Sequence, residues 1–143
     1  MTQDWAIDTP EQLSQVIQGR SDQEIRDGLK SLGIDSALER VFAGMVDAFL
    51  PDVAKGQEAV IQWDLATPEG ARQYHLIVAG GSCQAKSGSA TNPRVTLAIP
   101  VEDFLRVITG KLSGVQAFFQ GKLKISGDVL FAQAQEAWFK KPS

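Results

Sequence analysis

Few side chains in this sequence could carry covalent chemistry. His75 is the single histidine, and it alternates with Tyr74 and Leu76 in a pattern that is typical of a strand. No serine or cysteine near it belongs to a nucleophile motif. Cys83 is the single cysteine, so the chain offers neither a Cys-x-x-Cys redox pair nor a cysteine zinc site. We therefore expect no catalytic residue, no metal site and no cofactor.

The acidic pair and the glycines that might suggest a reaction centre also have structural explanations. Glu102 and Asp103 fall in the first turn of a predicted helix, where negative charge complements the helix dipole. The glycines that could contribute to a phosphate loop fit neither nucleotide-binding fingerprint; they stand at positions 80, 81, 110, 114, 121 and 127. These residues therefore predict neither acid–base chemistry nor nucleotide binding.

The elements that position these side chains begin with three helices. Thr9 and Gln12 form a capping pattern with a proline in the first turn, which predicts a short first helix. Ser21 and Glu24 form a second capping pattern, which predicts a helix that ends near Gly33. A longer apolar stripe then follows at helical spacing until Pro51; it comprises Leu38, Val41, Phe42, Met45, Val46, Phe49 and Leu50. This stripe predicts a helix that packs on a large apolar surface.

The period then changes from helical to alternating. Residues 59–65 and 74–78 alternate around a Thr-Pro-Glu-Gly turn and predict a hairpin, with further strands at 82–86 and 95–99. Helical spacing returns over 101–108, followed by a short helix that ends at Phe118 and Phe119, a strand with Leu123 and Ile125, and a last helix capped by Asp128. Helices beside one mostly antiparallel sheet predict an α+β fold.

Composition and charge indicate which partners and which cellular location to expect. The chain has 143 residues, enough for one domain, and its 14 basic and 17 acidic residues give a net charge of -3, which argues against nucleic acid as a partner. The lone cysteine and an N-terminus without a basic-then-apolar pattern favour a cytoplasmic location. No apolar run reaches the roughly 18 residues of a membrane span, so we expect membrane contact, if any, to be transient.

Residues 116–128 form the most distinctive stretch of the chain. Ala-Phe-Phe closes a helix, Gly-Lys stops it, Leu-Lys-Ile makes a strand, and Gly-Asp opens the last helix. This stretch resembles the signature of the sterol-carrier-protein-2 domain family. Family-like elements precede it in the family order: Asn-Pro-Arg-Val-Thr-Leu at 92–97, Glu-Asp-Phe-Leu at 102–105 and Thr-Gly-Lys-Leu at 109–112. The chain ends in Lys-Pro-Ser rather than a peroxisomal tripeptide, so peroxisomal targeting is not implied.

The resemblance implies a five-stranded, mostly antiparallel sheet, helices over one face and a hydrophobic tunnel between them. Such a tunnel would bind a fatty acid, a fatty acyl-CoA, a sterol or a similar lipid. Gln133 is the candidate polar anchor for a ligand head group. The candidate ligand-binding residues are Trp63, Phe104, Ile108, Phe118, Phe119, Leu130, Phe131, Gln133 and Trp138.

Other interpretations of the same residues remain open at this point. Apolar residues at helical spacing more often form plain core than a pocket, and Gln133 would then be a solvated helix residue. The resemblance is strong from residue 92 to about 133 and covers residues 59–90 only in their strand pattern. We assign residues 34–143 to the lipid-binding domain, and residues 1–33 to a helical extension that could cap the domain or dock partner enzymes. The protein would then be either a lipid carrier or an accessory protein that presents a lipid or quinone to enzymes. An enzyme acting on a bound acyl or steroid substrate would need His75 to face the pocket.

Overall fold

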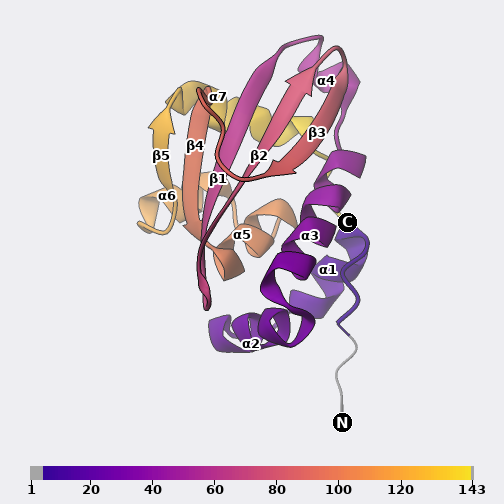
Figure 1. The fold of residues 1–143 in the computed structure, drawn as a ribbon, viewed down its shortest axis with the longest axis vertical. Helices are drawn as coiled ribbons and strands as arrows, with labels where there is room; N and C mark the ends of the chain where they lie inside the picture. Colours follow the sequence, from indigo (N-terminus) through magenta and orange to yellow (C-terminus); the bar gives the residue numbers. More distant parts are fainter. Residues whose placement is uncertain (1–4, 143) are drawn as a thin grey trace.

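The computed structural model describes residues 5–142 (Figure 1). Residues 1–4, on which the argument against a secretion signal mainly rests, and Ser143, the last residue of the C-terminal tripeptide, lie outside the described residues.

A five-stranded sheet forms the centre of the molecule. Its strands are β1 (Ala59–Thr67), β2 (Gly70–Ala79), β3 (Ser82–Ser87), β4 (Val95–Pro100) and β5 (Lys124–Gly127), in the spatial order β3-β2-β1-β4-β5. The pairs β1–β2, β2–β3 and β4–β5 are antiparallel, whereas β1 and β4 run parallel. The sheet is therefore mixed and mostly antiparallel, as predicted.

Helices cover one face of this sheet, and the other face is turned toward the viewer in Figure 1. The helical elements are α1 (Pro10–Ile17), α2 (Asp22–Leu32), α3 (Ile34–Asp47), α4 (Pro51–Ala54), α5 (Val101–Ile108), α6 (Gly114–Phe119), α7 (Val129–Ala134) and the 3-10 helix η1 (Gln135–Trp138). Both capping boxes predicted for α1 and α2 are present, at Thr9–Gln12 and Ser21–Glu24. The predicted α+β fold is confirmed.

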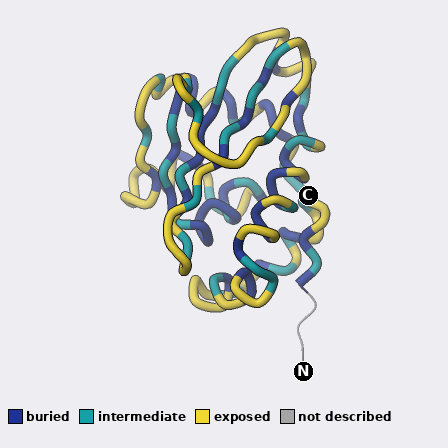
Figure 2. The backbone as a smooth tube through the Cα atoms, viewed as in Figure 1, coloured by how far each residue is buried: buried dark blue, intermediate teal, exposed yellow. Residues whose placement is uncertain are grey.

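Alternation along the strands decides which side chains face the helices. Ile61, Trp63 and Leu65 of β1 are nearly inaccessible, as are Leu97 and Ile99 of the parallel neighbour β4. Phe42 of α3 and Phe104 of α5 stack with ring centroids 5.3 Å apart, so that the two helices meet in the same core. Figure 2 shows that buried residues occur along the strands of the sheet and in the helices. The core therefore lies between one face of the sheet and the helical layer.

The first two helices belong to this same core. Ile17 of α1 and Ile25 and Leu29 of α2 are at most 2% exposed and are part of one continuous cluster of buried residues. Ion pairs add to the packing, because Arg26 binds Glu102 at 2.7 Å and Arg106 binds Asp22. Since Glu102 is almost fully buried, its pairing with Arg26 compensates a carboxylate that would be costly to bury alone.

The end of the chain differs in detail from the prediction. The last helix is regular only to Ala134 and continues as a 3-10 turn to Trp138. After this turn, Lys140 donates its backbone N–H to Ala48 at 2.8 Å and Leu50 donates to Trp138 at 2.7 Å. These bonds attach the C-terminus to the end of α3 and fix the position of α7 over the sheet.

Candidate ligand cavity

An apolar cavity, here called the main cavity, lies between the sheet and the last third of the chain. It has a volume of about 240 Å³. Trp63, Leu97 and Ile125 line it from three adjacent strands, and α6, the segment before β5, α7 and η1 supply the rest of the wall. The remaining lining residues are Gly114, Val115, Phe118, Phe119, Leu123, Val129, Ala132, Gln133, Gln135 and Glu136. An apolar cavity of about 150 Å³ already accommodates a benzene molecule, so this one has room for an apolar segment of a ligand.

The mouth of this cavity is bordered by exposed apolar side chains. Val115, Phe118 and Val129 line the cavity and are each about half exposed, while Phe119 is 80% exposed. Leu130, the neighbour of Val129, does not line the cavity and is 81% exposed. Single exposed apolar residues are ordinary, but a group of them around one opening is a candidate binding surface.

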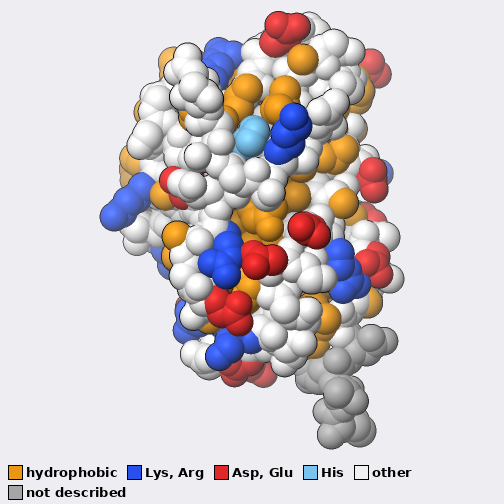
Figure 3. Space-filling model, viewed as in Figure 1, with side chains coloured by type: hydrophobic (Ala, Val, Ile, Leu, Met, Phe, Trp, Pro, Cys, Tyr) orange, Lys and Arg blue, Asp and Glu red, His pale blue; other side chains and the backbone are white. Residues whose placement is uncertain are grey.

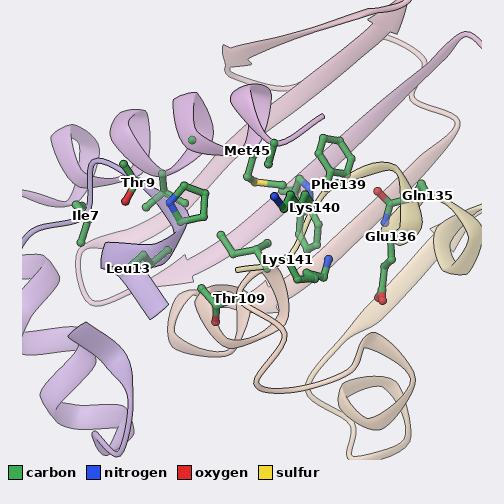
Figure 4. Close-up of a pocket in the computed structure, with 16 residues that line it drawn as sticks. Ile7, Thr9, Leu13, Met45, Thr109, Gln135, Glu136, Phe139, Lys140 and Lys141 are labelled. Carbon is green, nitrogen blue, oxygen red and sulfur yellow. The ribbon is translucent and has the colours of Figure 1, made fainter. Parts of the chain in front are cut away.

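A second, smaller cavity adjoins the main one (Figure 4). Its volume is about 30 Å³, close to the volume of one water molecule in the liquid. Ile7, Thr9 and Leu13 line it from the N-terminal segment. The C-terminal residues that line it are Gln135, Glu136, Phe139, Lys140 and Lys141. Trp63, Gln135 and Glu136 line both cavities, so the wall between them consists of these three side chains.

Glu136 is the charged group at this shared wall. Burial raises its pKa, although the nearby Lys141 ammonium and a hydrogen bond from the Gly114 N–H act in the opposite direction. Burial also lowers the pKa of Lys141, against the attraction of Glu136. Gly114 allows the carboxylate to come this close, because a Cβ at residue 114 would overlap Oε1 of Glu136. The arrangement therefore keeps a carboxylate at the edge of an otherwise apolar cavity.

Five of the nine candidate ligand-binding residues line a cavity. Trp63, Phe118, Phe119 and Gln133 line the main one, and Ile108 and Trp63 line the smaller one. Gln133 lines the main cavity and is solvent-exposed. The buried Nε1 of Trp63 has no hydrogen-bond partner among the described residues, which leaves an unsatisfied donor in the wall that the two cavities share.

The other four candidates lie elsewhere. Phe104 is fully buried between Phe42 and Trp63, with centroids 5.3 and 4.9 Å away, and therefore serves as core. Phe131 and Trp138 pack against each other at 5.2 Å under α7. Leu130 extends outward from the same helix. Phe131 and Leu130 are next to each other in sequence, but adjacent helix positions point about 100° apart, so only one can face the sheet.

The two residues with reactive side chains lie apart from the main cavity. His75 pairs with Gln62 in the register of β1 and β2, on the face opposite Trp63, and Figure 3 shows its ring on the outer face of the sheet. Its Nδ1 is 2.9 Å from the carbonyl oxygen of Gly88. Cys83 is buried in β3, and its burial raises the pKa of the thiol to about 11, so it stays protonated at neutral pH. The enzyme interpretation thus lacks the histidine that it required at the pocket.

The apolar cavity between the sheet and the helices is a candidate binding site for an apolar ligand. Residues 38–140 match the model of the SCP-2 sterol transfer family. The chain therefore belongs to that family. Among residues 5–142, no helix combines the length and the apolar character needed to cross a membrane.

Individual relatives agree with this assignment. Hydroxysteroid dehydrogenase-like protein 2 of Rattus norvegicus is 28% identical over 96 residues, which cover 67% of this chain and 18% of that relative. This chain thus matches less than a fifth of the relative's length. The oleate-induced peroxisomal protein POX18 of Candida maltosa is 32% identical over 92 residues, covering 63% of this chain and 72% of the relative.

Solved structures show the same fold. Sterol carrier protein 2 like 2 of Aedes aegypti superposes in its crystal structure with a TM-score of 0.59 at 25% identity, over 75% of this chain and 96% of the other. The solution structure of the same protein in its palmitated form gives a TM-score of 0.57 at 28% identity, over 74% of this chain and 94% of the other.

Sequence reasoning missed most of the residues that line the two cavities, among them Glu136, Gln135 and Leu13. Glu136 and Gln135 follow the last apolar stripe and resemble an ordinary solvated helix end, yet Gln135 is 3% exposed and donates to the carbonyl of Ala132 at 3.0 Å. Helical spacing predicts only that Leu13 lies on the apolar face of α1. In the structure, Leu13 also lines the smaller cavity. No local pattern identifies these roles, because they depend on where the C-terminal turn meets α1 and α3.

Proposed function

We propose that this protein binds an apolar lipid, such as a fatty acid, a fatty acyl-CoA or a sterol, in the main cavity and transfers it without chemical change. The observation that carries the proposal is the cavity of about 240 Å³ between sheet and helices, whose mouth is bordered by exposed apolar side chains. Such a site needs no reactive residue. Each buried methylene contributes about 0.8 kcal/mol, so a long acyl chain offers on the order of 10 kcal/mol before the costs of association.

Family membership supports the same proposal. The solved relative from Aedes aegypti is described in a palmitated form, and its sequence is 28% identical to this one. Gln133 is the proposed anchor for a polar head group, because it lines the cavity and its amide can both donate and accept hydrogen bonds. Trp63, Phe118 and Phe119 are the proposed apolar contacts, and Ile108 would touch only a ligand that reaches the smaller cavity.

Native mass spectrometry of protein purified gently from its own source, followed by denaturing extraction, tests the proposal. A stoichiometric acyl lipid, quinone or steroid would support it and would identify the ligand. Protein that is empty, and that also takes up no fatty acid, acyl-CoA or sterol, would contradict it.

A second candidate is an accessory protein that presents a bound lipid or quinone to enzymes. It is favoured by one observation: the rat relative is a much longer chain whose name describes a dehydrogenase-like protein, and this chain matches only 18% of it. The proposed partner surface is the N-terminal segment 1–33, whose helix α2 exposes Gln23, Glu24 and Lys30 to solvent. Co-purification of biosynthetic enzymes that is lost when these three exposed residues are replaced would support this candidate over a free carrier.

We also propose that the protein acts in the cytoplasm, on the grounds of its single buried cysteine. The relative from Candida maltosa carries a peroxisomal name, so cell fractionation decides between the two locations. Recovery of the protein with peroxisomes would contradict the cytoplasmic assignment.

A further inference from the structure

The indole N–H of Trp63 is a buried hydrogen-bond donor that has no acceptor in the described part of the chain. Trp63 is 4% exposed, and its Nε1 meets no acceptor among residues 5–142. A buried donor that stays unpaired costs free energy, so such groups nearly always have a protein, water or ligand partner. Phe104 packs on the ring at 4.9 Å and offers no acceptor from its side chain. Because the ring borders both cavities, a partner from outside the chain would reach it there.

Two hydrogen-bond acceptors line the same two cavities. Gln135 and Glu136 begin η1, and Figure 4 shows both side chains. The amide of Gln135 donates through Nε2 to the carbonyl of Ala132 at 3.0 Å, while its oxygen accepts no hydrogen bond from a described residue. The Glu136 carboxylate accepts from the Gly114 N–H, and a carboxylate can accept several further bonds. The wall that the cavities share therefore holds one unpaired donor and two acceptors.

A hydroxyl group is the ligand group that matches this set, because it both accepts and donates hydrogen bonds. A carbonyl oxygen could accept from Trp63 but could not donate to the two acceptors. A carboxylate would be repelled by Glu136, and Lys141, which lines only the smaller cavity, is already attracted by that same carboxylate. Elsewhere the main cavity is mostly apolar, so a hydroxyl buried there would lose its water without replacement.

From this arrangement we propose that the main cavity selects lipids that carry a hydroxyl group on their buried part. The hydroxyl accepts from Nε1 of Trp63 and donates to Gln135 or Glu136. The inference rests on the proposed function, since it assumes that a lipid enters this cavity. An acid head group on the same lipid would stay near Gln133, which is solvent-exposed. Trp63 is thereby a specificity-determining residue as well as part of the apolar wall.

Paired titrations test this selectivity on the full chain. Saturated fatty acids of increasing length are compared with the ω-hydroxy acids of the same length, each by displacement of a fluorescent fatty acid. In a purely apolar cavity the terminal hydroxyl should weaken binding about tenfold or more. Here the hydroxy acid should bind at least as tightly as the plain acid at the length at which its hydroxyl reaches Trp63. Weaker binding of the hydroxy acid at every length would overturn the inference.

Removal of the donor alone separates hydrogen bonding from packing. Benzothienylalanine at position 63 keeps the shape of the ring and replaces its N–H by sulfur. The Kd of the best hydroxy acid should rise about tenfold, and that of the plain acid should stay the same. Trp138 is the matched control, because it is 3% exposed but lines neither cavity, and the same replacement there should change neither Kd. An equal loss of affinity for both acids at position 63 would show packing only and overturn the inference.

The indole proton of Trp63 reports the bond directly. Its nuclear magnetic resonance signal, identified by its loss in Trp63→Phe, should move downfield with the hydroxy acid and not with the plain acid. The smaller cavity has room for about one water molecule, so water is the competing partner. A contact between this proton and bound water that persists with the hydroxy acid would overturn the inference. Plain acid that binds, with no preference for the hydroxy acid, would leave the proposed function standing, whereas failure of both acids to bind would contradict that function and the inference with it.

Discussion

The indole ring of Trp5 lies directly over Gly28 of α2, so closely that a Cβ at residue 28 would overlap the ring. The guanidinium of Arg20 covers the same ring, 5.3 Å from its centroid. Trp5 is thereby held between α2 and the segment that connects α1 to α2, and it is only 8% exposed. This contact joins the beginning of the described chain to the helices that follow it.

Gly28→Ala should destabilise the protein even though alanine favours helices. The added methyl group must displace a rigid ring, and such overpacking costs about 1–3 kcal/mol, of which helix propensity offsets about 1 kcal/mol. Gly44→Ala is the matched control, because a Cβ there would meet only Pro10 Cδ at 3.6 Å, an ordinary contact. Urea unfolding should show a loss for residue 28 and a gain of up to about 1 kcal/mol for residue 44. Equal gains for both variants would mean that Trp5 does not pack on α2.

Ala132→Leu should block ligand binding by filling the cavity. Ala132 lines the cavity and is 4% exposed, so three added carbons would occupy space that the proposed ligand needs. Displacing about three methylenes costs about 2.4 kcal/mol of binding, which is roughly a 50-fold weaker Kd for a fatty acid. Ala134→Leu, on the exposed side of the same helix, should leave the Kd unchanged. Titration with a fluorescent fatty acid measures both, and equal affinities in the two variants would place the ligand outside this cavity.

Affinity should rise with the length of the acyl chain until the cavity is full. Each additional buried methylene contributes about 0.8 kcal/mol, which lowers Kd by about fourfold. Beyond the length that the cavity of about 240 Å³ can hold, further methylenes should add little. Calorimetric titration with saturated fatty acids of increasing length gives the break point. A Kd that never depends on chain length would show that only the head group is recognised.

Glu136→Gln should change how stability depends on pH. The pKa of Glu136 is raised by burial above the ordinary value of 4.5, so the folded protein binds this proton more tightly than the unfolded chain does. The stability contributed by the protonated group is therefore fully present below pH 4.5 and is lost as the pH rises through the raised pKa. Glutamine cannot lose a proton, so the variant should gain stability relative to wild type as the pH rises. Urea unfolding at several pH values measures this, and a difference independent of pH would contradict it.

Local signals in the sequence predicted the elements well. The caps at Thr9 and Ser21, the hairpin turn at residues 67–70 and the cap at Asp128 each depend on a few neighbouring residues, and each is present. No local signal predicts the parallel pairing of Ile61 with Val95, because no turn connects these strands and their register depends on distant packing. Local patterns predicted the individual strands. The five-stranded sheet that they form was predicted from the resemblance to a known family.

The sequence could not predict which individual residues line the main cavity. Periodicity assigns Phe104 and Phe118 equally to apolar faces, yet Phe104 is enclosed by two aromatic rings and Phe118 borders an opening. The difference lies in the neighbours that three-dimensional packing brings to each ring, and apolar pattern does not encode these neighbours. The burial of Glu136 has the same origin, since it depends on the absence of a side chain at Gly114.

Of the 13 residues around the main cavity, 11 come from the single stretch between Gly114 and Glu136, and only Trp63 and Leu97 come from elsewhere. The strands β1 to β4 and the helices α1 to α5 lie outside this stretch. Exchanging residues 114–136 between related proteins would therefore transfer nearly the whole cavity wall while leaving most of the scaffold intact. Changes in this one segment could therefore alter the ligand preference of the proposed cavity while the rest of the fold stays the same.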